Sequence, residues 1–130
     1  MKITTEKPPF WIHNRLKDIT GCSFSKGMIV TIGDTIHAFR VLSDDVIARE
    51  KIHSLQQSIM GTEEWWKEYL INDRFRMSQD IESYREQYRY LKEVSNNHVK
   101  ALRLSHRVSK ELSTIDKNHN YKDIVKLIQG

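Results

Sequence analysis

The chain has 130 residues, 38% of them hydrophobic and 29% charged, which is enough apolar side chain to bury one core. Its single cysteine, Cys22, excludes an internal disulfide, and no run approaches the ~20 apolar residues that a membrane-spanning helix needs. Because the polar start also lacks the apolar segment of a signal peptide, we expect a cytoplasmic protein with a single domain spanning residues 1–130.

Positive charge is concentrated in the last third of the chain. Residues 1–84 contain 11 Lys and Arg against 12 Asp and Glu, whereas residues 85–130 contain 10 against 5. The net charges of −1 and +5 add to the +4 of the whole chain. Such a sided excess indicates a polyanionic or acidic partner for the C-terminal region, although a solvated helix face that binds nothing can carry the same charge.

The first portion, residues 1–61, predicts a short helix, a β-hairpin and a second helix. After an extended start, apolar residues recur at helical spacing from Phe10 to Thr20, and Gly21 is placed to end the helix. Two β-rich runs, 28–32 and 35–42, flank Gly33-Asp34, a pair typical of a type II′ hairpin turn. Pairing Ile32 with Thr35 predicts a core face for the hairpin that consists of Met28, Val30, Ile32, Phe39 and Val41.

A second helix is predicted from the cap Ser43 to the stop signal Gly61. Its first turn carries two acids, Asp44 and Asp45, which the helix dipole favours. Its apolar residues are Val46, Ile47, Ile52, Leu55 and Ile59.

The second portion, residues 62–130, predicts a long helix or a helical hairpin followed by a short helix at 121–128. No Gly or Pro lies between Thr62 and Thr114. An apolar seam steps by 4, 3, 4 and 3 residues, as in a coiled coil, and indicates packing along another helix of this chain or of a second copy; it consists of Met77, Ile81, Tyr84, Tyr88 and Leu91. A homodimer would satisfy the same seam. Polar residues at 95–98 indicate a kink or the corner of a hairpin.

Beyond that corner the apolar pattern resumes. The expected face consists of Val99, Leu102, Val108, Leu112 and Ile115, and a turn is predicted at 116–120. Together these elements predict an α+β fold that is predominantly α, with a short N-terminal helix and a hairpin packed on the long helical portion.

Basic residues at 3- and 4-residue spacing make the strongest candidate site. They are Arg85, Arg89, Lys92, Lys100, Arg103, Arg107 and Lys110. On an unbroken helix they would share one face over roughly 37 Å, suited to phosphates of nucleic acid or to an acidic protein surface. A break at 95–98 would divide them into two patches that lie side by side or face apart.

Aromatic residues form a second candidate surface, Trp65, Trp66 and Tyr69. Neighbouring tryptophans are ~100° apart on a helix, so one of them should reach solvent or a second layer. Exposure would favour a protein interface, whereas burial would make both part of a core with the hairpin.

Catalytic and cofactor motifs are not found. There is no Gly-rich phosphate loop, and the histidines and Cys22 lack metal-ligand spacing, so we expect no metal, no cofactor and no enzyme activity. The sequence favours a small non-enzymatic protein that binds nucleic acid through the basic residues. The alternative is an adaptor or inhibitor that regulates a larger enzyme or complex, for example one carried by a phage or plasmid.

Overall fold

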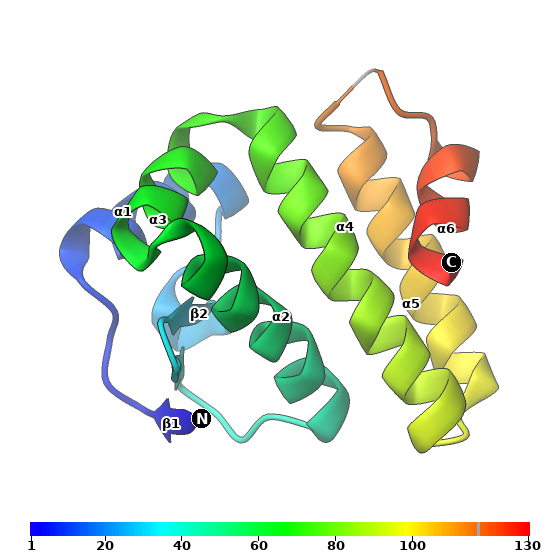
Figure 1. Cartoon of the computed structure of the whole chain (residues 1–130), viewed down its shortest axis with the longest axis horizontal. Helices are drawn as coiled ribbons and strands as arrows, with labels where there is room; N and C mark the ends of the chain where they lie inside the picture. Colours follow the sequence, from blue (N-terminus) through cyan, green and yellow to red (C-terminus); the bar gives the residue numbers. More distant parts are fainter. Residues whose placement is uncertain (117) are drawn as a thin grey trace.

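The predicted fold class is confirmed by a computed structural model, which describes residues 1–116 and 118–130. The described chain is mostly helical and contains one small sheet. Figure 1 shows the sheet, α1 and α3 in one half of the molecule and α4, α5 and α6 in the other, with α2 between them. The helices are α1 (Phe10–Thr20), α2 (Asp44–Met60), α3 (Thr62–Ile71), α4 (Asp73–Arg89), α5 (His98–Ser113) and α6 (Tyr121–Gln129).

The sheet contains the predicted hairpin and one further strand. Strands β2 (Ile29–Ile32) and β3 (Thr35–Ala38) pair antiparallel with Ile32 opposite Thr35, which confirms the predicted register. The extended start of the chain forms β1 (Lys2–Thr4), which pairs parallel with β3 and makes β3 the central strand. A strand of three residues has too little periodicity to be recognised in a sequence.

The predicted core face of the hairpin is correct for Val30 and wrong for Phe39 and Val41. Val30 is fully buried, whereas Phe39 and Val41 are 57% and 98% exposed. The reason is that β3 ends at Ala38, so the chain leaves the sheet before those residues. Ile36, on the opposite face, is also fully buried, because the hairpin is covered on both sides.

The first helices begin and end near their predicted limits. Gly21 adopts a left-handed conformation (φ 73°) after α1, and α2 ends before Gly61. The boundary between α3 and α4 at Asn72 was not predicted. The Asn72 side chain accepts a hydrogen bond from the backbone N–H of Phe75 and caps α4, so an asparagine within an apparently continuous helical pattern starts a new helix.

The polar segment at 95–98 is the corner of a helical hairpin. A π-helical turn, Tyr90–Val94, ends α4. Asn96 has a positive φ of 51°, and the Asn97 side chain accepts from the backbone N–H of Lys100 at the start of α5. Asparagine tolerates the left-handed region and caps helices well, which explains why the chain reverses here.

The apolar seam is filled within the chain. Met77 and Leu91 are buried in a core formed by α4, α5 and α6, and Ile81, Tyr84 and Tyr88 pack against it. The seam therefore has an intrachain partner and gives no separate reason to expect a dimer. The other members of this core are Ala101, Leu104, Val108, Leu112, Ile124 and Ile128.

The predicted face of α5 is correct for Val108 and Leu112, which are buried, and wrong for the other three residues. Val99 and Leu102 are 61% and 50% exposed, and Ile115 lies beyond the helix, also exposed. Small residues take their place: Ser105, fully buried, lets α6 approach closely enough for Gln129 to donate to its hydroxyl. Helix α6 forms as predicted, while the predicted turn at 116–120 includes residue 117, which lies outside the described residues.

Helix α2 buries its polar side. Gln57 is fully buried, donates to the carbonyl oxygen of Thr31 (2.7 Å) and accepts from the backbone N–H of Gly33 (2.8 Å), so it fastens the hairpin to α2. In contrast, Leu55 and Ile59 are 55% and 81% exposed. Four further polar residues of α2 are at most 8% exposed: Asp45, Glu50, His53 and Gln56. Among the described residues every fully buried side-chain nitrogen or oxygen has a hydrogen-bond partner, which makes this polar interior energetically acceptable.

Candidate nucleic-acid interface

The corner at Ser95–Asn97 divides the predicted row of cations into two groups. Three lie on or just after α4: Arg85, Arg89 and Lys92. Four lie on α5: Lys100, Arg103, Arg107 and Lys110. Because α5 runs back along α4 (Figure 1), the continuous ~37 Å row of an unbroken helix does not form.

The α4 group lies among acids. Arg85, Arg89 and Lys92 line one groove together with three glutamates, Glu82, Glu86 and Glu93. The guanidinium of Arg89 is 2.5 Å from Glu86 and 3.1 Å from Glu93, and these hydrogen-bonded carboxylates raise the pKa of Arg89. With as many negative as positive side chains, this group has little charge left to attract a polyanion.

The four α5 cations project from the exposed side of the helix, and α5 carries only one acid, Glu111. Two of them approach carboxylates at the edge of the face: Lys100 is 3.8 Å from Asp45 of α2, and Arg107 is 3.8 Å from Glu111. The Lys100 and Arg107 side chains are 55% and 61% exposed, so each pair is weak and solvent-screened. Four cations against these two carboxylates leave this face with a net charge of +2.

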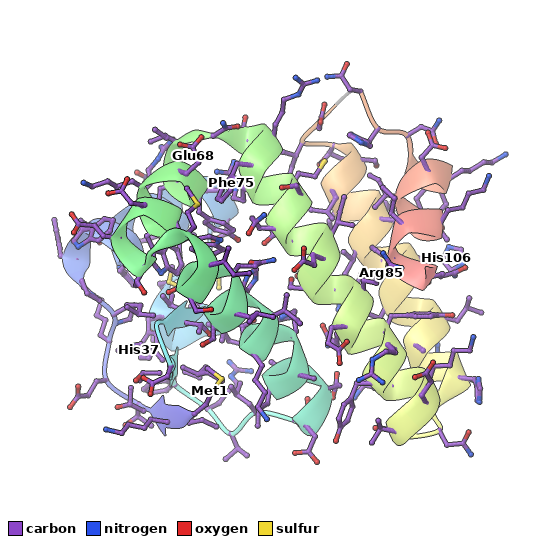
Figure 2. All side chains as sticks on the ribbon, viewed as in Figure 1. Met1, His37, Glu68, Phe75, Arg85 and His106 are labelled. Atoms are coloured by element: carbon purple, nitrogen blue, oxygen red, sulfur yellow. The ribbon has the colours of Figure 1, made fainter. Side chains whose placement is uncertain are left out.

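Arg107 and the α4 group line different hollows of the molecule. Arg107 lines a cavity between α2, α3, α4 and α5, whereas Arg85 lines the groove that contains the C-terminal Gly130, and the two sites share no lining residue. Figure 2 places Arg85 and His106 in the half of the molecule that contains α4, α5 and α6. His106 adjoins the α5 cations in sequence, and its ring contacts the Tyr121 hydroxyl of α6.

The aromatic cluster is buried. Trp65 and Trp66 are 1% and 4% exposed, so neither forms a protein interface on the surface of this chain. They reach two different layers: the indole N–H of Trp66 donates to the carbonyl of Thr31 in the sheet, and that of Trp65 donates to the side chain of Gln79 on α4. Tyr69 stacks on Trp65 with ring centres 4.6 Å apart. These residues therefore belong to the core, which was the second of the two sequence interpretations.

Sequence reasoning missed the polar side of α2. Arg49, His53, Gln56 and Gln57 recur at 3- and 4-residue spacing, which is the signal that could have located it. Analysis of apolar periodicity passes over such a pattern because polar residues are assumed to face solvent.

No group of three or more potential metal ligands gathers among the described residues, and no helix in that part of the chain is long and apolar enough to cross a bilayer. Comparison with known proteins finds no matching family model, no matching curated protein and no matching solved structure.

Proposed function

We propose that this protein binds nucleic acid through the exposed face of α5, by contacts to phosphates. The observation that carries the proposal is the set of four exposed cations, Lys100, Arg103, Arg107 and Lys110, on a helix with a single acid. They step by 3, 4 and 3 residues, so they lie on one side of the helix over roughly 15 Å. That length matches four to five phosphate steps at about 3.4 Å each.

The proposal predicts binding without strong sequence preference. Lysine and arginine neutralise phosphates and release condensed counterions, which makes affinity fall with salt. Two arginines in the row can donate in pairs to a phosphate, a geometry that lysine lacks. Base recognition would need a side chain placed in a groove, and no feature of α5 argues for it.

A matched pair of variants tests the proposal. One neutralises Arg103, Arg107 and Lys110 to glutamine, and the other neutralises Arg85, Arg89 and Lys92 in the same way. Both remove three positive charges, so a difference between them reports position rather than net charge. Fluorescence anisotropy with labelled DNA of about 20 nucleotides, as a duplex and as a single strand, measures the affinity from about 50 to 200 mM salt. The slope of log affinity against log salt concentration gives the salt slope.

The α5 variant should lose most of the affinity and lower the salt slope by about three, at ~0.9 per phosphate contact. The α4 variant should change the slope by less than about one, because its cations lie among glutamates. Equal losses in both variants would show that net charge alone drives binding. Undetectable binding of both strands to the unmutated protein at low salt would rule the proposal out.

A further inference from the structure

A cavity of ≈ 530 Å³ lies between α1, β2, α2, α3, α4 and α5, and its volume is that of a small-molecule site. One wall is apolar and is formed by Leu16, Met28, Ile29 and Trp66. The remaining wall carries charged and phenolic groups from four of the helices around it: Arg49, Glu50 and His53 of α2, Tyr69 of α3, Asp80 and Tyr84 of α4, and Arg107 and Glu111 of α5.

The tautomer of His53 follows from its neighbour Gln56. The Gln56 amide nitrogen donates to the backbone carbonyl of Gln79 (3.1 Å), and a carbonyl can only accept, so the orientation of the amide is determined. Its oxygen then faces the Nδ1 of His53 at 2.8 Å. Because that oxygen also only accepts, the Nδ1 of His53 carries a proton.

The other ring nitrogen of His53 faces a carboxylate. His53 Nε2 is 3.7 Å from Asp80 Oδ1, which also accepts a hydrogen bond from the Tyr69 hydroxyl (2.8 Å). A neutral imidazole protonated at Nδ1 would turn its Nε2 lone pair toward a carboxylate, which is repulsive. A proton on Asp80 would remove this repulsion. Burial raises the pKa of Asp80, although the positive charge of His53 and the Tyr69 hydroxyl oppose the shift, and this favours retention of the proton.

Asp80 carries the one carboxylate of the cavity without a guanidinium partner. Arg49 lies 2.8 Å from Glu50, whose other oxygen accepts from the Thr31 hydroxyl, and Arg107 pairs with Glu111. Among the described residues no side chain or backbone group hydrogen-bonds the Oδ2 of Asp80. The Asp80 side chain is 18% exposed, so a small molecule can reach this oxygen.

We propose that the cavity binds a small primary alkylammonium ion, with the ammonium on Asp80 and the alkyl chain against the apolar wall. An anion is disfavoured because the largely buried Arg49 is paired with Glu50, and because the lining carries three carboxylates, Glu50, Asp80 and Glu111, against two guanidiniums. A neutral ligand supplies no positive charge to the carboxylate of Asp80, whose Oδ2 has no hydrogen-bond donor among the described residues. An ammonium supplies the missing donors and positive charge, and nearby aromatic rings favour a cation.

The ammonium takes over the role of a proton on Asp80. One positive charge enters the cavity and one proton leaves to solvent, so the charge of the site is conserved. Affinity therefore increases with pH over the range in which Asp80 releases its proton, and binding releases up to one proton per ligand. The proposal is independent of the α5 interface, because it makes no use of nucleic acid.

Isothermal titration calorimetry with n-butylammonium chloride tests the proposal, with 1-butanol as the neutral probe of similar shape. The unmutated protein should bind butylammonium at least about tenfold more tightly than butanol, with an enthalpy that depends on the ionisation enthalpy of the buffer, as proton release requires. Asp80→Asn should weaken butylammonium binding at least about tenfold and abolish proton release. Glu111→Gln, on the exposed edge of the same cavity, should change affinity less than about threefold.

A measurement without mutation protects the test against misfolding of the Asp80→Asn variant. The His53 ring signals of the unmutated protein, followed by NMR at pH 7, should shift on addition of butylammonium and not on addition of butanol. Equal binding of the two probes, equal affinity of Asp80→Asn and the unmutated protein, or unchanged His53 signals would overturn the proposal.

Discussion

Helices α2 and α5 bury opposite kinds of surface. Helix α5 follows the usual pattern, with Leu104 and Val108 in the core and its cations in solvent. Helix α2 inverts it, since Glu50 and Gln57 are buried while Ile59 is 81% exposed. The difference arises from what each helix meets: α5 packs on the apolar seam of α4 and on α6, whereas α2 meets backbone groups of the hairpin and the polar side of α4.

This contrast shows that the partner surface selects the buried face of a helix. A row of glutamines and charged groups can be buried when each polar atom finds a partner, and the hydrogen bonds then specify the packing. On α2 the chain of contacts runs from Thr31 through Glu50 and Arg49 to Gln87, and from there to Asp45. The stability of the two halves of the molecule should therefore respond to opposite kinds of substitution.

The largest expected effect is on α2, at Glu50. Glu50→Leu leaves the Arg49 guanidinium and the Thr31 hydroxyl without their carboxylate partner. The Glu50 side chain is only 5% exposed. We expect a loss of about 3–5 kcal/mol in the free energy of unfolding, measured by urea denaturation, because a buried charge loses its counterion. Ile59→Ser, an apolar-to-polar change on the exposed side of the same helix, should cost less than about 0.5 kcal/mol. The reverse order of the two effects would contradict the polar packing of α2.

Sequence patterns predicted most helix limits in both regions, with the exception of the boundary at Asn72, because the signals that set these limits are local. Helix limits depend on caps and stop signals such as Gly21 and Asn97, which act within a few residues and can be recognised without a partner. The hairpin register was predictable for the same reason, since Gly33-Asp34 determines which residues pair.

Faces and sites were less predictable because they depend on distant residues. Nothing near Gln57 in the sequence indicates that a carbonyl of the hairpin will face it. The sequence indicated that a break at 95–98 would divide the seven cations, but the number of acids around each group depends on how the helices pack. The cavity at Asp80 combines residues from six helices and strands, and no short sequence motif indicates such an arrangement.

The matching test on α5 uses Leu104, which is 5% exposed in the C-terminal core. Leu104→Ala should lower the free energy of unfolding by about 2–5 kcal/mol, through lost burial and the cavity left behind. Arg103→Ala, one position away and exposed, should change it by less than about 0.5 kcal/mol. Thermal and urea denaturation should agree on this order. A larger effect at Arg103 would mean that the cations of α5 hold the fold together, and would weaken their assignment to a free binding face.

Asp45 links α2 to α5. Its substitution should have the smallest of the three effects on the free energy of unfolding, and this effect should depend on pH. Asp45 lies at the start of α2, accepts from Gln87 of α4 (2.8 Å) and is 3.8 Å from Lys100 of α5. Burial alone would raise the pKa of Asp45, but hydrogen bonds from Gln87 and Ser43 and the charge of Lys100 outweigh burial and lower it. A carboxylate whose pKa is lower in the folded state stabilises the fold above its unfolded value of 3.8, and this contribution disappears as pH falls through the folded pKa.

Asp45→Asn should therefore cost about 1.5–3 kcal/mol at pH 7, the range for a hydrogen bond to a charged group, and progressively less below pH 3.8. Asp44→Asn is the matched control, because Asp44 occupies the same helical turn and is exposed. Denaturation midpoints from pH 7 down to pH 2 should converge for Asp45→Asn and the unmutated protein, while Asp44→Asn stays parallel to the latter. Convergence would show that the link between α2 and the basic face of α5 depends on an ionised carboxylate, whereas a constant difference would assign the role of Asp45 to packing alone.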